Sequence, residues 1–124
     1  MRVKDISIRF SFIKATEGAD DTDWRFKRNW RGAKEAGIIR GAYHFFNPYK
    51  DGKQQAQNFI DEVRLQKGDM PPVLDIEQTG VVGKEVLQQR IADWLNIVER
   101  QYKTKPIIYT GADFYEKYLS ETEK

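Results

Sequence analysis

Cysteine is absent from the 124-residue sequence, and histidine occurs once, as His44. The absence of cysteine excludes disulfide bonds, thiolate chemistry and metal sites ligated by sulfur. With one histidine, a metal site of several histidines or a Ser-His-Asp hydrolase is not expected. Catalysis by this chain would therefore rest mainly on carboxylates, with tyrosines, lysines and amides in support.

Long apolar runs and a strong excess of charge are also missing. The first ten residues contain no apolar stretch long enough for a signal peptide, and no later stretch is long enough to cross a bilayer. The 21 basic and 19 acidic residues leave a net charge of +2, which gives no indication of a nucleic-acid partner. The length, with 40% hydrophobic and 32% charged residues, is typical of one soluble globular domain, which we place at residues 1–124.

Short β-prone runs alternate with segments of helical periodicity. The apolar runs predict four strands, at residues 10–15, 38–46, 73–77 and 106–110. The predicted helices are one that follows Asp23 as N-cap and ends at Gly37, one that closes near Gly68, one over 87–102 and one over 112–119. Such crossovers join parallel strands, so the fold class is α/β with about four parallel strands. A doubly wound sheet and part of a (β/α) barrel both satisfy this order.

The third predicted strand carries two acidic residues, Asp75 and Glu77, in the segment PPVLDIEQTG. Side chains alternate along a strand, so Asp75 and Glu77 share a face with Val73, while Leu74 and Ile76 face the other way. Two residues along a strand span roughly 6.6 Å, which brings both carboxyls within reach of one substrate. The two acids are therefore a candidate catalytic pair.

The same alternation groups other residues of the predicted strands on shared faces. It pairs Tyr43 with Phe45, Ile107 with Tyr109, and both Phe10 and Phe12 with Lys14. Lys14, Phe45, Glu77 and Tyr109 lie near the carboxyl ends of their strands, where parallel α/β proteins have their sites. Acids and aromatic rings at such an edge are typical of a carbohydrate site, in which rings cover sugar faces and acids act on the glycosidic oxygen.

Other interpretations of these residues are open at this point. Asp75 and Glu77 could instead cap the next helix or form an ion pair with Lys14, and an Asp-x-Glu pair can also hold a divalent metal. The aromatic residues, taken singly, are more often part of a core than of a ligand site. His44 falls on the face opposite Tyr43, which favours a packed structural histidine over a general base.

Five segments along nearly the whole chain stand out together: FSFIKATEG, AKEAGIIRGAYHFF, QAQNF, PPVLDIE and PIIYTG. In their order and spacing they resemble glycoside hydrolase family 25, the Chalaropsis-type lysozymes (N-acetylmuramidases) that cleave peptidoglycan. Each segment alone is a weak signal, whereas five in register are a strong one. The resemblance implies a (β/α)-barrel-like fold of the TIM-barrel type, present here in part.

The resemblance also implies hydrolysis of the β-1,4 bond between N-acetylmuramic acid and N-acetylglucosamine, on peptidoglycan strands of the bacterial cell wall and without a cofactor or metal. Glu77 matches the family's proton donor, and Asp75 matches the second acid of its Asp-x-Glu motif. Two nearby carboxylates resist ionising together, so the pKa of one of them rises. Asp75 would orient the substrate's acetamido group as an internal nucleophile, or else position a water for inversion. The residues expected to bind substrate are Tyr43, Phe45, Tyr109, Lys14 and Glu17.

The sequence also departs from that family. Nothing before Phe10 matches the family's opening strand with its Asp, and the family continues beyond Lys124, so we expect an incomplete copy that lacks at least one active-site acid. A catalytically inactive wall-glycan-binding remnant is the alternative to a muramidase, and a metal-dependent α/β enzyme comes third. Four strands cannot close a barrel. Segments 10–15 and 106–110 would be its outer strands, and a two-fold homodimer is expected to cover the open sheet.

Overall fold

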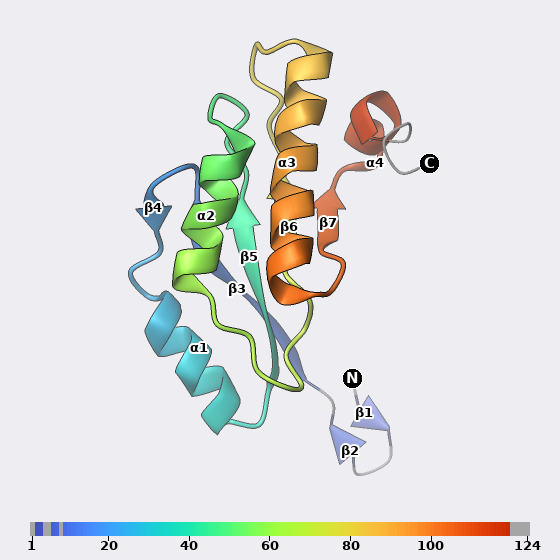
Figure 1. Cartoon of the computed structure of the whole chain (residues 1–124). Coiled ribbons are helices and arrows are strands. Elements are labelled where there is room, and N and C mark those ends of the chain that lie inside the picture. The colour runs from blue at the N-terminus through green and yellow to red at the C-terminus, as the bar shows by residue number, and fades with distance from the viewer. Residues whose placement is uncertain (1, 4–5, 8, 120–124) are drawn as a thin grey trace.

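The computed structural model describes residues 2–3, 6–7 and 9–119. Most of its strands form one five-stranded sheet of order β4-β3-β5-β6-β7 (Figure 1). The strands of this sheet are β3 (Phe10–Glu17), β4 (Asp21–Thr22), β5 (Ile39–Phe45), β6 (Val73–Ile76) and β7 (Ile107–Thr110). Two further strands, β1 (Arg2–Val3) and β2 (Ile6–Ser7), pair with each other in antiparallel orientation.

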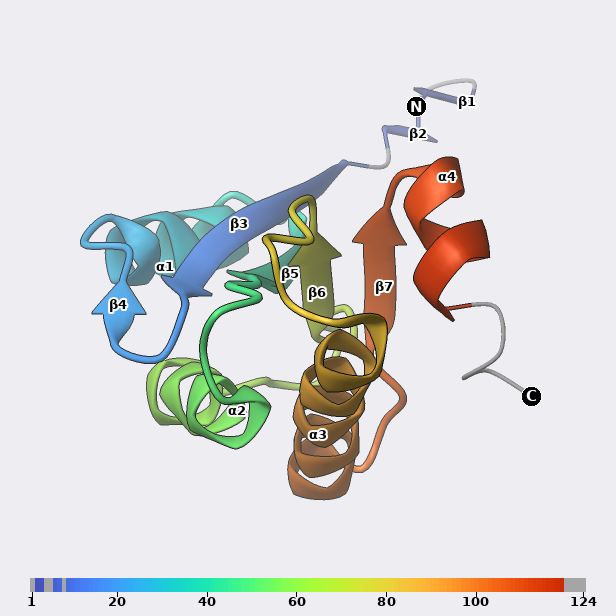
Figure 2. The same cartoon turned by 90° about the horizontal axis from the view of Figure 1, so that it is seen from above.

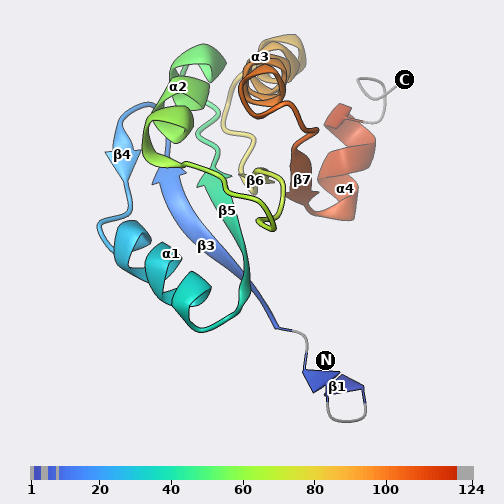
Figure 3. The same cartoon turned by 60° about the horizontal axis from the view of Figure 1, so that its bottom comes forward.

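Helices alternate with the parallel strands, as expected from the periodicity. They are α1 (Phe26–Glu35), α2 (Gly52–Glu62), α3 (Lys84–Tyr102) and α4 (Ala112–Phe114), and the last is continued by the π-helical turn η1 (Tyr115–Leu119). In Figures 2 and 3, α2 and α3 lie side by side along the sheet, and α1 lies beside β3. The buried faces of all three helices contribute to one hydrophobic core. No helix among residues 9–119 combines the length and apolar character that a membrane span requires.

The sheet order distinguishes the two topologies that the sequence left open. β3, β5, β6 and β7 are parallel, and each is the neighbour of the next one in the chain. A doubly wound sheet has helices on both faces, whereas the three crossover helices here pack into one core on a single face. The prediction of four parallel strands with alternating helices is confirmed. Closure into a barrel of the TIM type stays a prediction, because the described sheet is open. The homodimer also stays a prediction, because the structure describes a single chain.

A single hydrophobic core lies between the sheet and these helices. Its members are buried side chains from the facing sides of both layers, among them Phe26, Trp30 and Ala33 of α1, Ala56 and Phe59 of α2, Leu87, Ile91, Trp94 and Val98 of α3, and Leu74 and Ile76 of β6. The helical faces predicted from the apolar spacing are thus the buried faces. The alternation predicted for β6 also holds, because Leu74 and Ile76 enter this core while Val73 and Asp75 point to the uncovered side.

The polar stretch after β3 contains a strand that the sequence did not predict. β4 pairs in antiparallel orientation with the end of β3, through Thr16↔Thr22 and Glu17↔Asp21. Segment 10–15, predicted as an outer strand, has no strand paired to its outer side among the described residues, because β4 pairs only with Thr16 and Glu17. The strand itself is longer than predicted, since β3 runs on to Glu17 where the predicted strand stopped at residue 15.

The first helix begins later than predicted. Asp23 is not its N-cap, because α1 starts at Phe26 with Arg25 in the N-cap position. The Asp23 carboxylate accepts a hydrogen bond from the Arg25 N–H at 2.9 Å and so stabilises the turn before the helix. The predicted end is confirmed: Gly37 has a φ of 73°, and the following N–H, of Ile38, donates to the Ala33 carbonyl at 2.9 Å.

The second helix is shorter than predicted. It begins after Asp51, whose carboxylate accepts from the Lys53 N–H at 3.0 Å, and it ends at Glu62 rather than near Gly68. Val63 already has an extended backbone, with a φ of −108° and a ψ of 120°. Its carbonyl accepts a 2.6 Å hydrogen bond from the Tyr102 hydroxyl of α3, which is a partner that helical periodicity does not reveal.

His44 is a structural residue, as its position opposite Tyr43 predicted. Its ring is fully buried, and Trp94 stacks on it at 5.6 Å between ring centroids. The Gln55 amide nitrogen donates to the Asn47 carbonyl, so its oxygen faces His44 Nε2 at 2.9 Å and accepts from it. Nδ1 then accepts from the Thr16 hydroxyl at 2.6 Å. Burial lowers the pKa of His44 to about 4, so the ring is neutral at ordinary pH.

Candidate active site

The two acids lie at the carboxyl end of β6, one buried and one exposed. Asp75 is 8% exposed and faces the side of the sheet that the helices leave uncovered. Glu77 lies one residue beyond the end of the strand and is exposed. The pair therefore combines a carboxyl set into the sheet with a second carboxyl at its rim.

Asp75 is held in an environment that favours its protonated form. Burial, together with the charge of Glu77 and a hydrogen bond with it, raises the pKa of Asp75 to about 6, while the charge of Lys14 acts in the opposite direction. Its Oδ1 atom is buried and has no hydrogen-bond partner among the described residues. Asp75 can consequently hold or release a proton at mildly acidic pH, and one of its oxygens is available to accept a hydrogen bond.

Parallel register brings the predicted site residues into two rows across the sheet. One row at the carboxyl end runs Glu17↔Phe45↔Asp75↔Tyr109, and the row beneath it runs Lys14↔Tyr43↔Val73↔Ile107. Phe45 and Tyr109 thus lie on either side of Asp75, and Tyr43 and Ile107 flank Val73 in the row beneath. The sequence prediction of one shared edge is confirmed for the fold, while the roles of these residues stay predictions.

A cavity of about 350 Å³ opens on this face of the sheet. It is lined by Phe12, Tyr43, Val73, Asp75, Ile107 and Tyr109. Tyr109, at 65% exposure, presents its ring to solvent beside the buried Asp75. Aromatic rings around a single carboxyl give the cavity both an apolar surface and one polar anchor, which is the composition of a small-ligand site.

A β-bulge in β3 determines where Lys14 and Glu17 point. The register shifts between Lys14 and Thr16, so that Thr16 enters the core and Glu17 returns to the face of Lys14. The Lys14 ammonium lies 2.5 Å from a carboxylate oxygen of Glu17 and 5.3 Å from the centroid of the Phe45 ring. The hydrogen bond to Glu17 raises the pKa of Lys14, which therefore stays charged.

Two of the other interpretations of Asp75 and Glu77, an ion pair with Lys14 and a cap of the next helix, do not match the structure. Lys14 forms its ion pair with Glu17 and not with Asp75 or Glu77. Neither acid caps the following helix, because the N-cap of α3 is Gly83 and no side chain bonds to it. Among the described residues, no group of three or more His, Cys, Asp and Glu side chains is placed to hold a metal ion.

Tyr43 lies between the charged groups of the two rows. Its pKa is raised mainly by burial, and the negative charges of Asp75, Asp23 and Glu77 add to the effect while Lys14 opposes it. The phenol therefore remains protonated and can donate a hydrogen bond at neutral pH. The electrostatic contribution of Asp23 was not predicted, because the sequence suggested only a helix cap there.

A contact between two rim loops, which the sequence also did not indicate, supports the segment after Glu77. The Tyr49 hydroxyl accepts from the Val81 N–H at 3.0 Å. A Cβ at Gly80, whose φ is 63°, would lie 2.7 Å from the Tyr49 ring. The Tyr49 ring therefore packs directly against the backbone of Gly80, at a position where a side chain would overlap with the ring. This contact links the loop after β5 to the loop that follows the acid pair.

The raised pKa of Asp75 predicts a pH-dependent effect of its removal. An acid whose pKa rises on folding, here from 3.8 to about 6, contributes stability that is present below its ordinary pKa and is lost as the pH rises through about 6. Asp75→Asn does not titrate, so its stability relative to the unchanged protein should increase as the pH is raised from about 4 to about 7. Urea unfolding across this range measures the difference, and a difference that is constant with pH would contradict the assignment.

An uncovered parallel sheet with an acid pair and aromatic rings at its carboxyl edge is an arrangement typical of α/β glycosidases. Comparison with known sequences identifies the family. Residues 1–124 match the profile described as "Glycosyl hydrolases family 25". The chain belongs to that family, and the resemblance inferred from its five segments is confirmed.

Individual relatives extend over much longer chains. The uncharacterized protein YegX of Escherichia coli (strain K12) is 44% identical over 120 residues, which make up 97% of this chain and 44% of that protein. Lysozyme M1 of Streptomyces globisporus is 37% identical over 123 residues, covering 91% of this chain and 42% of that protein. The chain thus spans less than half the length of these curated relatives.

Solved structures agree with the family assignment. A family 25 glycosyl hydrolase from Bacillus anthracis superposes with a TM-score of 0.84 at 34% identity, over 90% of this chain and 54% of that one. A family 25 lysozyme from Aspergillus fumigatus gives a TM-score of 0.80 at 30% identity, over 89% and 57%. The described sheet and helices therefore have the fold of the matching part of these enzymes.

Proposed function

We propose that this chain carries the acid pair of a muramidase, which hydrolyses the β-1,4 bond between N-acetylmuramic acid and N-acetylglucosamine in peptidoglycan of the bacterial cell wall. The observation that carries the proposal is the placement of Asp75 and Glu77 on the uncovered face, at the carboxyl end of β6. Membership of family 25 and the names of relatives such as Lysozyme M1 support the same reaction.

Glu77 is proposed as the general acid. It is exposed at the rim, where a glycosidic oxygen of a bound glycan can approach it. Its proton passes to the leaving-group oxygen as the bond from the sugar C1 to that oxygen breaks. The resulting Glu77 carboxylate then takes a proton from the water that completes hydrolysis.

Asp75 is proposed to assist from below the substrate. Its unpartnered Oδ1 is suited to accept a hydrogen bond from the N–H of the substrate's acetamido group. That bond would orient the acetamido oxygen to attack C1 as an internal nucleophile. In the alternative route Asp75 positions a water for inversion. The substrate-assisted route is favoured because the buried Asp75 has one oxygen in need of a donor.

The flanking residues are proposed to bind the sugars. Tyr109 and Tyr43 line the cavity beside Asp75, and their rings offer surfaces for sugar faces. Phe45 lies in the same row as Asp75 and holds Lys14 over its ring. Lys14 and its partner Glu17 would contact polar groups of the glycan at the carboxyl edge.

A non-catalytic glycan-binding role is the second candidate. It is favoured by the open cavity face, on which Phe12, Ile107 and Tyr109 are exposed. Such a module would hold peptidoglycan strands through the same aromatic residues without cutting them.

Digestion of purified peptidoglycan separates the two roles. We expect soluble muropeptides with N-acetylmuramic acid at their reducing ends, detected by mass spectrometry, and the same yield in the presence of a chelator. Binding to the insoluble wall without any release of muropeptides would overturn the catalytic proposal and support the binding module. Release that a chelator abolishes would point to the metal-dependent alternative.

A further inference from the structure

The segment QAQNF, residues 55–59, is one of the five that carry the family resemblance, yet it supplies no residue to the cavity on the uncovered face. It lies in α2, where Ala56 and Phe59 belong to the hydrophobic core. The two amide side chains Gln55 and Asn58 are directed instead to polar groups of other elements. Core packing therefore accounts for the apolar members of the segment but not for these two amides.

Gln55 joins three elements through one fully buried amide group. Its oxygen accepts from Nε2 of His44 and from the Asn47 N–H, both at 2.9 Å. Its nitrogen donates to the carbonyls of Asn47 at 2.8 Å and Lys50 at 3.1 Å. All the donors and lone pairs of the amide are thus used. Because these bonds fix the His44 ring, its other nitrogen is kept toward Thr16, at the bulge of β3.

Asn58 holds the turn that follows the bulge. Its side-chain nitrogen donates to the carbonyls of Gly18 and Asp21, each at 3.1 Å. Gly18 comes directly after β3 and Asp21 is the first residue of β4, so one amide of α2 bridges both arms of the turn. Glu17 lies between Thr16 and Gly18, and its backbone is therefore held on both sides by side chains of the same segment.

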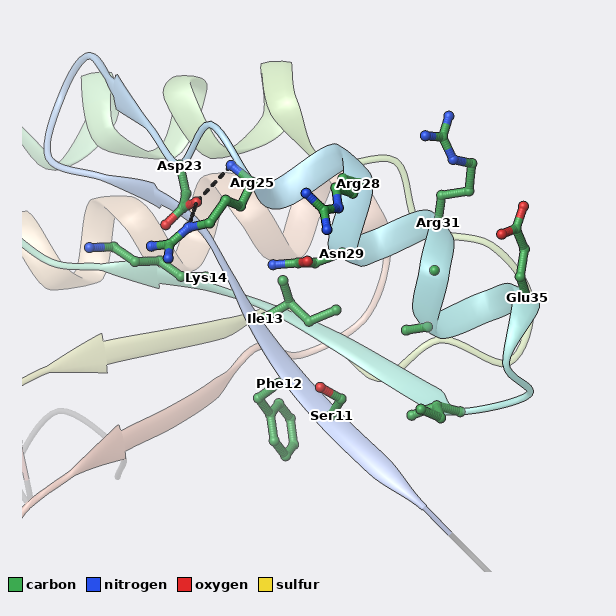
Figure 4. A pocket seen from close by; sticks show the side chains of 13 residues that line it. Ser11, Phe12, Ile13, Lys14, Asp23, Arg25, Arg28, Asn29, Arg31 and Glu35 are labelled. Atoms are coloured by element: carbon green, nitrogen blue, oxygen red, sulfur yellow. Dashed lines mark hydrogen bonds and ion pairs between the residues drawn. The ribbon is translucent and has the colours of Figure 1, made fainter.

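The position of Glu17 in turn decides where the Lys14 ammonium lies. Lys14 forms its ion pair with Glu17, at 2.5 Å. Asp23 is the other carboxylate whose charge reaches Lys14 at this end of β3, but Figure 4 shows it bonded to Arg25. Lys14 therefore depends on Glu17 for its ion pair, and displacement of Glu17 would release the ammonium to solvent.

We propose that Gln55 and Asn58 are positioning residues, which hold Glu17, and with it Lys14, at the carboxyl edge of the sheet in the arrangement that binds glycan. Gln55 acts from the core, and Asn58 acts from the turn after β3. The part of the proposal that concerns glycan rests on the proposed function, whereas the hold on Glu17 and Lys14 does not.

The direct measurement is the pKa of Lys14, followed by NMR of its ε-carbon as the pH is raised. The hydrogen bond with Glu17 raises this pKa above its usual value. Asn58→Leu keeps the approximate shape of the side chain but removes both donors to the turn, so the pKa of Lys14 should fall toward its usual value. The matched control is Gln57→Leu, because Gln57 is an exposed amide of the same segment that donates to Asp61 within α2. That change should leave the pKa of Lys14 where it is.

The path from Gln55 is tested at its far end. Replacement of Gln55 itself leaves buried polar groups of His44 and of the loop without partners, which can prevent folding. Thr16→Val keeps the shape of the side chain and removes only the hydroxyl that bonds to His44, so it should also lower the pKa of Lys14. An unchanged pKa in folded Asn58→Leu or Thr16→Val would overturn the role of the corresponding amide and leave it a contribution to stability alone.

Hydrolysis of soluble glycan fragments shows whether this position matters for binding. In Asn58→Leu, KM should rise about fivefold, the effect of losing one exposed polar contact, while kcat changes by less than about twofold. The measurement uses whichever form of the protein hydrolyses peptidoglycan. An unchanged KM together with a lowered pKa of Lys14 would overturn the contact with glycan. If no form hydrolysed peptidoglycan, the proposed function would fail, and the pKa of Lys14 would still decide whether the amides hold Glu17.

Discussion

Glu77→Gln is expected to reduce peptidoglycan hydrolysis by about a thousandfold, the contribution that a well-placed general acid makes. The amide has the shape of the carboxyl group but cannot give its proton to the leaving sugar oxygen. Because Glu77 is exposed at the rim, the substitution should not disturb the fold. The measurement is the release of muropeptides, made on whichever form of the protein, this chain or a longer one, hydrolyses peptidoglycan.

The matched control for this prediction is Glu99→Gln. Glu99 is an exposed acid near the end of α3, away from the acid pair, so the same chemical change there should leave hydrolysis unaffected. Asp75→Asn should also lose most of the activity, because the amide no longer offers a charged acceptor to the acetamido group. Retention of most activity by Glu77→Gln, with unchanged unfolding, would remove Glu77 from the role of proton donor.

The part of the site that could be predicted from the sequence depends on local rules. Alternation along VLDIE separates Asp75 from Leu74 and Ile76, and these residues indeed face opposite sides of the sheet. Parallel pairing then sets Tyr109 beside Asp75 without any further information. Both rules concern the backbone, and they hold for β6 and β7, whose pairing shows no register shift.

The part that could not be predicted depends on contacts between distant residues. The bulge in β3 has no local signal, since FSFIKATE reads as one regular strand. It exists where Thr16 turns inward to donate to His44, 28 residues away in the sequence. The position of Glu17 beside Lys14 is a consequence of that turn, and so a regular alternation would have put these two residues on opposite faces.

The end of α2 is also a feature that local sequence rules could not predict. Ala56, Phe59 and Val63 have helical spacing and are all buried, yet the backbone has left the helix by Val63. Burial of Val63 is compatible with either conformation. In the extended conformation the Val63 carbonyl accepts a hydrogen bond from the Tyr102 hydroxyl of α3 at 2.6 Å, a contact that helical spacing does not indicate.

Gly52→Ala is expected to destabilise the chain by about 3 kcal/mol, the upper range for overpacking a tight interior contact. Gly52 is the first residue of α2, and a Cβ there would lie 1.9 Å from the carbonyl oxygen of Arg90 and 2.7 Å from its carbonyl carbon. These atoms belong to the backbone of α3, so no side-chain rotation can relieve the overlap. The Arg90 guanidinium also donates to the Pro48 carbonyl at 2.6 Å, which fixes α3 against the same loop.

Gly32→Ala provides the control, because a Cβ at Gly32 within α1 meets nothing within 4 Å. Removal of the flexibility of glycine from a helix should stabilise the chain by about 0.5–1 kcal/mol. Urea unfolding of the two variants should therefore give shifts of opposite sign. The loop before Gly52 also carries Tyr49, which supports the segment after Glu77 through Val81, so separation of α2 from α3 should weaken that contact as well. If Gly52→Ala unfolded at the same urea concentration as the unchanged protein, the close approach of the two helices would be wrong, and with it the rigid support inferred for the rim loops.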